Sequence, residues 1–454
     1  MQSFELTKAY IESLKEAIEK EDSNTVLSMV GDLRAADIAD VTAELETEEA
    51  QFVYSLLDKE TSADAITEME EDEREELFKE MPPEYIAREL INNMDSDDAA
   101  DVLSELSDEL QVEILQKIPD IDQAGDIADL LSYDENTAGG LMATELIRVN
   151  INWNIFTCLR EMRKQAENVD EIYYVYAVDD NNIFKGTVTL KNLLLAAGTT
   201  KIKAIYDPDN ITVHTDMPAA EVASIMEKYN LVALPVIDNI GRLKGRITID
   251  DVVDVIREEA EKDYQLMSGI SEDIDSDDNV WMLTRARIPW LIIALFGGIL
   301  GSMVISQFTG ELSLYPQLII FIPMITAMGG NVGIQSSAII VQGLANNSLG
   351  LESTAQKLTK ELGVAVMNGL VLSSLIFAYN LIFTHSYALT ISVSVALFTV
   401  IVFASIFGTI VPLFLNRIKI DPALATGPFI TTVDDIMGVL IYLMIGRQLF
   451  EVMQ

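Results

Sequence analysis

The sequence predicts a multidomain membrane protein. An all-α, solenoid-like helical domain, a duplicated α/β region and an acidic connecting helix precede a five-helix α transmembrane domain. The first observation behind this fold class is charge: the net charge is −42, yet only seven basic and seven acidic residues follow position 284. The second is that five long apolar stretches lie in this nearly neutral C-terminal part. The asymmetry indicates two environments, water for the acidic part and lipid for the apolar part.

Residues 1–132 are predicted to form short amphipathic helices. A similar dipeptide recurs every 24 residues, at Ala39-Asp40, Ala63-Asp64 and Ala87-Arg88. Such a repeat is typical of helix-turn-helix units stacked into a small solenoid, and a plain helical bundle is the alternative. The acidic charge argues against nucleic acid as a partner, because phosphates would be repelled. It favours counter-ions, divalent cations above all.

Residues 133–256 are predicted to form an α/β region of two copies, at about 138–200 and 201–256. The segment YAVDDNNIFKGTVTLKNLLLA matches PVIDNIGRLKGRITIDDVVDV at an offset of 59 residues. Identical pairs are Asp179 and Asp238, Lys185 and Lys244, Gly186 and Gly245, and Thr189 and Thr248. In each copy two β-branched runs flank an Asn- or Gly-rich turn, which predicts strand, turn, strand and helix.

Residues 257–282 are predicted to link this region to the membrane. A helix from Asp250 to Met267 is apolar on one side and acidic elsewhere, and a polar loop follows at 271–279. Residues 283–454 hold five predicted membrane helices, at 288–308, 317–344, 361–384, 387–414 and 422–446. Each is near the roughly 20 residues that cross the hydrocarbon core. Basic clusters on one side place the N-terminus in the cytoplasm and the C-terminus outside, so a multi-pass cell-membrane protein is expected.

The second apolar span, FIPMITAMGGNVGIQSSAIIVQG, is rich in proline and glycine. This composition predicts an interrupted helix that exposes backbone carbonyls to a cavity. Asn331 and Gln335 are four residues apart, so their amides are expected to share one helix face and to serve as pore ligands. The alternative is helix packing through small residues.

The fifth span carries Asp434 and Asp435 well inside an apolar run. A carboxylate at that depth costs at least about 2.5 kcal/mol and is by default a functional residue. Adjacent helical residues point about 100° apart, so the two are not expected to face one narrow pore equally. Thr431 and Thr432 add oxygen atoms one turn earlier, and Asp421 is expected at the cytoplasmic mouth. These three are further candidate pore ligands.

Hard oxygen donors with no Cys or His among them suit Mg²⁺ or Ca²⁺ rather than Zn²⁺ or Cu²⁺. An enzyme is not expected, because the chain has only His214 and His385, no phosphate-binding loop and no nucleophile-base constellation. Transport must then follow an ion gradient. Two alternatives to a channel remain open: a proton-coupled exporter using Asp434 or Asp435, and a membrane-anchored sensor without an ion path. The single cysteine, Cys158, fits a reducing compartment.

The duplicated region resembles a tandem of CBS domains. The resemblance rests on the strand-Gly-x-x-Thr pattern of both copies, over about 140–260. It implies a regulatory module, and some such modules bind adenine nucleotides. Here Lys191-Asn192 stands where nucleotide-binding examples more often carry a basic residue followed by Asp, which argues against nucleotide binding.

The stretches GGNVGIQ and DPALATGPFITTVDDIMG resemble the signature segments of the MgtE family of magnesium channels, and the order of parts matches over essentially the whole chain. The resemblance implies a homodimer that takes up Mg²⁺, with Co²⁺ or other divalent cations as further substrates, along the dimer axis. In the pattern Thr-Thr-x-x-Asp-x-x-Gly, which ends at Gly438, it identifies Asp435 as the residue that holds partly hydrated Mg²⁺. The role of Asp434 stays open.

The resemblance also implies that Mg²⁺ bound between cytosolic domains closes the channel. The residues matched to this sensing role are Asp97, Asp101, Asp251, Asp254 and Glu259. Two carboxylates 4 Å apart repel by up to about 4 kcal/mol at an effective dielectric of 20, and a bridging divalent cation turns repulsion into attraction. Asn230, Ala220 and Lys262 stand where acidic groups are expected, which predicts that some inhibitory sites are lost or moved.

Overall fold

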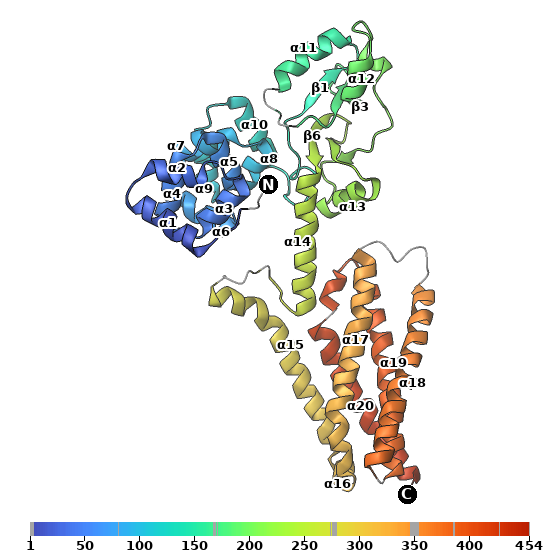
Figure 1. Ribbon diagram of the computed structural model, residues 1–454. Helices are drawn as coiled ribbons and strands as arrows, with labels where there is room; N and C mark the ends of the chain where they lie inside the picture. The colour runs from blue at the N-terminus through green and yellow to red at the C-terminus, as the bar shows by residue number, and fades with distance from the viewer. Residues whose placement is uncertain are drawn as a thin grey trace. The chain divides into compact units, whose positions relative to one another are not determined.

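The computed structural model describes residues 4–79, 81–166, 169, 171–272, 274, 279–345, 354–384, 386–425 and 427–453. They belong to two compact units, Met1–Arg257 and Glu258–Gln454. Figure 1 labels the helices and some of the strands of both units. Part of the polar loop predicted at 271–279, and His385, lie outside the described residues.

Short helices form the N-terminal part of the first unit, as the sequence predicts. Several begin at a side chain that accepts a backbone N–H of the first turn, namely Thr7, Asp22, Asp58 and Asp120. The elements are α1 (Lys8–Glu19), α2 (Ser23–Val30), α3 (Ala35–Ala43), α4 (Thr47–Leu56), α5 (Lys59–Thr67), α6 (Glu71–Lys79), α7 (Pro83–Tyr85), the π-helical turn η1 (Ile86–Leu90), the 3₁₀ turn η2 (Ile91–Asn93), α8 (Ser96–Ser104), α9 (Asp108–Leu115) and α10 (Ile121–Leu130).

The 24-residue repeat reflects how these helices stack. Ala39, Ala63 and Ala87 lie in α3, α5 and η1, and all three are buried in one apolar core. α3 contacts α5, and α5 in turn contacts η1. A small side chain at each repeated position lets successive helices approach closely. This is the solenoid-like helical domain that the sequence predicts.

Two three-stranded sheets of the same topology form the α/β region. In the first, β2 (Val175–Val178) pairs in parallel with β1 (Ile147–Asn150) and antiparallel with β3 (Phe184–Val188). The second repeats this arrangement with β4 (Val213–His214), β5 (Ala233–Ile237) and β6 (Leu243–Thr248). The helices are α11 (Ile155–Gln165), α12 (Leu190–Leu195), α13 (Ala219–Tyr229) and α14 (Ile249–Ser268). The predicted duplication is therefore structural.

The repeated Gly and Thr have identifiable local roles. Gly186 has a φ of +152° and lies so close to the Asp207 carbonyl that a Cβ would collide with it. Thr189 caps α12 by accepting a backbone N–H. Thr248 instead donates its hydroxyl to Asp251 Oδ2 at 2.8 Å, which fixes that carboxylate at the start of α14.

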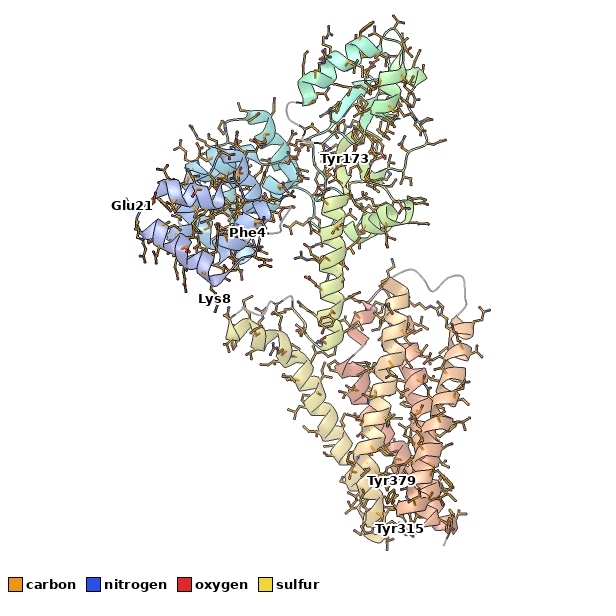
Figure 2. All side chains as sticks on the ribbon, viewed as in Figure 1. Phe4, Lys8, Glu21, Tyr173, Tyr315 and Tyr379 are labelled. Atoms are coloured by element: carbon orange, nitrogen blue, oxygen red, sulfur yellow. The ribbon has the colours of Figure 1, made fainter. Side chains whose placement is uncertain are left out.

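Five helices of the second unit are long and apolar enough to span a membrane, counting only the described residues. They are α15 (Val280–Gln307), α17 (Ile322–Ala345), α18 (Thr354–Phe383), α19 (Tyr387–Arg417) and α20 (Pro428–Met453). A short helix α16 (Thr309–Leu314) and two 3₁₀ turns, η5 (Pro316–Phe321) and η6 (Pro422–Ala425), connect them. α19 is central, because it contacts α17, α18 and α20. Tyr315 and Tyr379 lie towards the end of the unit that carries α16 (Figure 2).

The second membrane helix differs from its prediction as an interrupted helix. α17 is continuous, because Pro323 falls in its first turn, where no intrahelical hydrogen bond is lost. The glycines instead allow neighbouring helices to pack closely against α17. Gly330 packs on the methyl group of Thr431, and Gly333 lies against Gly408 at backbone distance. This span therefore fits the alternative interpretation, in which its small residues allow helices to pack closely.

The fifth span begins later than predicted. Residues from Pro422 form η6, and α20 begins only at Pro428. Gly427 has a φ of +53° and lies against the carbonyl of Met267, at the end of α14, where a Cβ would not fit. The end of the connecting helix therefore packs on the residues that begin the last membrane helix.

We expect Gly186→Ala to destabilise the α/β region by roughly 1–3 kcal/mol, because an L residue rarely adopts this backbone conformation and its Cβ would meet a carbonyl. Thermal unfolding of the full-length protein in detergent measures the change. Gly125→Ala, in α10, is the matched control, since open space surrounds that position. Equal stability of the two variants would contradict the strain assigned to Gly186.

Candidate metal centres

The two adjacent aspartates of α20 occupy different environments. Asp434 is 1% exposed and packs against Gly329 and Gly333 of α17. Both of its carboxylate oxygens are buried without a hydrogen-bond partner among the described residues. Asp435 is exposed on the surface of the unit. The divergence follows from the angle of about 100° between consecutive helical side chains.

Two other predicted pore ligands are exposed, as Asp435 is. Asn331 and Gln335 are exposed on α17, which contacts α20. The opposite face of α17 is buried and carries Gly333, Ser336 and Ser337. Three oxygen-bearing side chains therefore lie on exposed faces of two contacting helices, while the glycines face inward.

Thr431 and Thr432 are engaged in helix packing. The Thr431 hydroxyl donates to the Gly427 carbonyl at 3.2 Å, and the Thr432 hydroxyl donates to the Pro428 carbonyl at 2.6 Å. The methyl group of Thr432 presses on Gly297 of α15. Both hydroxyl hydrogens are therefore engaged in hydrogen bonds within α20. Only the lone pairs of the hydroxyl oxygens remain available to a cation.

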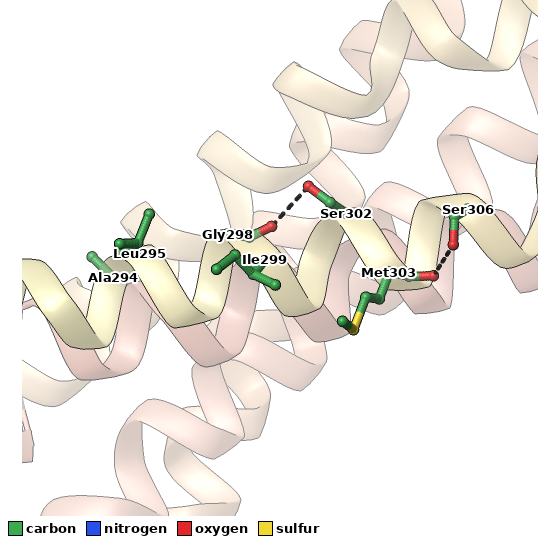
Figure 3. A pocket seen from close by; sticks show the side chains of 7 residues that line it. All are labelled: Ala294, Leu295, Gly298, Ile299, Ser302, Met303 and Ser306. Atoms are coloured by element: carbon green, nitrogen blue, oxygen red, sulfur yellow. Dashed lines mark hydrogen bonds between the residues drawn. The ribbon is translucent and has the colours of Figure 1, made fainter.

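A groove along α15 has no carboxylate in its lining. Its lining is Ala294, Leu295, Gly298, Ile299, Ser302, Met303 and Ser306. The two serine hydroxyls donate to backbone carbonyls of the same helix, at 2.9 and 2.7 Å (Figure 3). No charged group lines it, so the candidate centres lie elsewhere.

Acidic groups gather where α14 ends and the last membrane helix begins. Burial raises the pKa of Asp263, and the carboxylates of Asp421 and Glu259 raise it further. Asp421 is exposed and its Oδ1 accepts the Ala423 N–H at 2.8 Å. Sequence reasoning assigned Asp421 and Glu259 to separate sites and missed Asp263. Its spacing of four residues from Glu259, on one helix face, was the available signal.

A second acidic group lies at the start of α8 in the first unit. Asp95, Asp97 and Glu145 each offer a carboxylate oxygen, and these oxygens lie within 4.8 Å of one another. The Ser96 hydroxyl donates to Glu145 Oε2 at 2.8 Å. Asp97 Oδ1 is buried, and no described residue forms a hydrogen bond with it. This is a set of hard oxygen ligands of the kind that Mg²⁺ and Ca²⁺ prefer.

Burial of these carboxylates and their mutual repulsion raise their pKa values. Burial raises the pKa of Asp97 well above its ordinary value, and Asp98, Asp251 and Glu145 raise it further. Burial, together with neighbouring acidic groups, raises the pKa of Asp98 and that of Asp101 to about 7. A divalent cation placed among them would favour the charged forms and relieve the repulsion.

Asp251, on α14, belongs to the same acidic region as the carboxylates at the start of α8. Its Oδ2 accepts the Thr248 N–H at 3.0 Å and the Thr248 hydroxyl at 2.8 Å. Burial raises its pKa, although these hydrogen bonds act in the opposite direction. Asp254 and Glu259 have exposed side chains further along α14. Three of the five predicted sensing residues are therefore gathered in one acidic region, and the other two lie outside it.

Sequence reasoning missed three members of this region. Asp95 and Asp98 belong to the acidic run DSDD at 95–98, which was the available signal. Glu145 is far away in the sequence, and only the tertiary fold brings it to α8.

Among the residues that depart from the expected acidic pattern, Asn230 follows α13 with a φ of +50°, a left-handed conformation that Asn adopts readily.

Comparison with known proteins follows the same division of the chain. A model for divalent cation transporters, MgtE, matches residues 322–445; the MgtE intracellular N domain matches 33–136; and CBS domains match 138–198 and 202–258. The chain is 32% identical over 442 residues to the magnesium transporter MgtE of Thermus thermophilus, covering 97% of this chain and 98% of that protein. The chain belongs to the MgtE family.

Further relatives agree with this membership. Magnesium transporter MgtE of Bacillus subtilis is 30% identical over 313 residues, 69% of each protein. That of Enterococcus faecalis is 32% identical over 321 residues, 71% of each. The solved soluble part of a magnesium transporter is 29% identical, with a TM-score of 0.50, and covers 56% of this chain and 99% of that one. The cytosolic domain of the Mg²⁺ channel MgtE in complex with ATP is 31% identical, with a TM-score of 0.51, and covers 54% of this chain and 99% of that one.

In the presence of a chelator, we expect the α8 region to lose stability as the pH rises from about 6 to about 8. The folded-state pKa of Asp98 and of Asp101 is about 7, above the ordinary 3.8. Protons therefore bind the folded state more tightly, and their stabilisation is complete below the ordinary pKa and lost as the pH rises through 7. Hydrogen-exchange protection of α8 in the full-length protein in detergent, corrected for intrinsic rates, measures this.

Two controls accompany this measurement. Mg²⁺ is expected to restore protection at the higher pH, and Asp98→Asn is expected to reduce the pH dependence. Protection that increases with pH in the chelator would contradict the raised pKa values.

Proposed function

We propose that this MgtE family member carries Mg²⁺ across the cell membrane, down its electrochemical gradient, through a pore that two copies form together. Relatives that match most or nearly all of the chain are magnesium transporters by name. The observation that carries the proposal is the exposure of Asp435 on a membrane-spanning helix, together with two exposed amides on α17, a helix that contacts α20.

Exposure of Asp435 has an energetic consequence. A carboxylate that faces hydrocarbon costs at least about 2.5 kcal/mol near the bilayer centre. Asp435 therefore needs water, a cation or another protein surface beside it. A second copy with its own Asp435 would enclose a hydrated interface and direct two carboxylates at one cation. The homodimer is part of the proposal for this reason.

The ligand chemistry favours a hydrated ion. Mg²⁺ dehydrates reluctantly and usually keeps several waters. We assign Asp435 to hold these waters directly, with Asn331 and Gln335 accepting and donating further hydrogen bonds to them. Thr431 and Thr432 contribute the lone pairs that their backbone hydrogen bonds leave unused. Asp421, near the start of α20, attracts the cation at the cytoplasmic mouth.

Regulation is assigned to the acidic regions outside the membrane. Without a bound ion the carboxylates of Asp97, Asp101 and Asp251 repel one another, and Mg²⁺ bound there would hold α8 and α14 together. Asp254 and Glu259 extend the acidic surface along α14. Several sites acting together can supply the roughly 5.5 kcal/mol that moves a two-state equilibrium from 1:99 to 99:1. Low cytosolic Mg²⁺ would then open the pore.

The closing ligand is assigned to Mg²⁺ rather than to a nucleotide. Asn192 stands where nucleotide-binding CBS domains more often carry Asp. Its side-chain amide donates to the Ile205 carbonyl at 3.4 Å, and its backbone N–H donates to Thr189. In orientation, the acidic unit faces the cytoplasm and the C-terminus lies outside. No enzymatic activity is assigned.

Asp435→Ala is expected to abolish Mg²⁺ flux into liposomes that contain the purified protein, because the pore loses its charge for the hydrated ion. The assembly should remain folded, which size-exclusion chromatography verifies. Glu451→Ala is the matched control, since Glu451 is an exposed acid at the end of the same helix, and it should leave flux unchanged.

Normal Mg²⁺ flux in Asp435→Ala would remove the central residue of the proposal. Flux that changes the luminal pH of sealed liposomes would favour proton-coupled export, to which the buried carboxylate of Asp434 would be suited. Wild-type protein that passes no Mg²⁺ under a gradient would leave only the sensor alternative.

The double variant Asp97→Asn, Asp251→Asn is expected to raise the Mg²⁺ concentration needed for half-inhibition, because Mg²⁺ loses two of the carboxylates that would bind it in the sensing region. Deletion of residues 1–132 should weaken inhibition further. Flux measured against Mg²⁺ on the cytosolic side tests both, with Asp40→Asn, an exposed aspartate of α3, as the control. An inhibition curve identical to wild type in both variants would refute the sensing role.

A further inference from the structure

Three membrane helices meet at a carboxylate that the proposed pore does not use. Glu361, in the first part of α18, accepts hydrogen bonds at Oε1 from Ser336 of α17 at 2.6 Å and from Ser405 of α19 at 2.5 Å. The two serine oxygens lie 3.0 Å apart. Ser336 is 4% exposed and Ser405 is 1% exposed. A single carboxylate oxygen thus joins α17, α18 and α19.

This junction differs in kind from the other contacts of α17. Gly330 and Gly333 bring α17 close to its neighbours, but contacts through glycine are non-directional and tolerate rotation or sliding of the helix. Hydrogen bonds to a carboxylate are directional, and they are stronger than bonds between neutral groups. The Glu361 junction therefore selects one rotation of α17 among those that its glycines would accept.

The rotation of α17 determines which side chains it exposes. Ser336 follows Gln335 directly in the sequence, and Asn331 lies one turn before Gln335. Ser336 is buried at the junction, whereas Asn331 and Gln335 are exposed. Any turn of the helix about its axis would move these amides relative to Asp435 of α20.

We propose that Glu361 is a positioning residue that sets selectivity among divalent cations by fixing the direction of Asn331 and Gln335. Mg²⁺ demands near-ideal octahedral geometry, whereas Ca²⁺ accepts flexible geometry and a variable number of ligands. Loss of a fixed amide position therefore penalises Mg²⁺ more than Ca²⁺. The inference rests on the proposed function, because it requires the ion to pass along the exposed face of α17.

The test compares Mg²⁺ and Ca²⁺ influx into liposomes that contain full-length variants. Glu361→Ala is expected to lower the ratio of Mg²⁺ to Ca²⁺ influx about tenfold, which corresponds to about 1.4 kcal/mol. Glu361→Gln should keep most of the wild-type ratio, because its amide oxygen can accept both serine hydrogen bonds. The double variant Ser336→Ala, Ser405→Ala should reproduce the Glu361→Ala ratio, and it carries the test if Glu361→Ala does not fold.

Selectivity separates positioning from a merely structural role. A loss of folded protein would reduce the influx of both ions equally and leave their ratio unchanged. Ser374→Ala is the matched control, since that serine is exposed on α18 and bonds only the Leu370 carbonyl of its own helix in the described structure, at 2.6 Å. It should leave the ratio unchanged.

Two results would overturn the inference. One is an unchanged ratio in both Glu361→Ala and the double serine variant. The other is a Glu361→Gln ratio as low as that of Glu361→Ala, which would assign the effect to charge. If either occurs while the wild type passes Mg²⁺ normally, only this inference fails. A wild type that passes no Mg²⁺ would overturn the proposed function as well.

Discussion

An ionisable side chain inside a bilayer must reach water, a cation or a protein interior, and α20 places two such side chains next to each other. Because consecutive helical residues diverge by about 100°, the pair cannot share one environment. Asp434 turns into the glycine face of α17, and Asp435 turns to the surface of the unit. The fold thereby buries one carboxylate and leaves the other on the surface of the unit, where we propose that the ion passes.

Glycine contacts make this accommodation possible. Apolar side chains gain little by leaving lipid for a helix interface, so membrane helices associate through close packing and hydrogen bonds. Gly297 accepts the methyl of Thr432, and Gly330 accepts that of Thr431. The two threonines thus fix α20 between α15 and α17. Contacts of this kind set distance, and directional bonds such as those of Glu361 set rotation.

In the acidic region of the first unit, outside the membrane, carboxylates are also placed where their charge is unfavourable. Carboxylates from α8, from α14 and from the segment before β1 are held close enough to raise one another's pKa. Repulsion of this kind makes the ion-free arrangement less stable, so a divalent cation can act as a structural element whose presence depends on its concentration. Permeation and its control would then both rest on carboxylate charges that a divalent cation neutralises.

The sequence alone determined the order of parts, the duplication, the helical repeat and five membrane spans, because each leaves a local signature in charge, period or composition. It also placed Asp435, Asn331 and Gln335 as candidates, since polar residues in an apolar span are conspicuous. Tertiary structure decided which aspartate is buried, because that depends on the phase of α20 against α17. It likewise decided that the glycines of α17 serve packing in a continuous helix.

Contacts between residues far apart in the chain could not be predicted from the sequence. Glu145 reaches Asp97, and Glu361 reaches Ser336 and Ser405, only through the path of the folded chain. Periodicity reports on neighbours within one helix or strand, whereas these contacts join separate elements whose relative rotation is set by packing. Hydrogen bonds and carboxylate repulsion act over a few ångströms of space, whatever the separation along the chain, and for that reason only the three-dimensional fold could assign them.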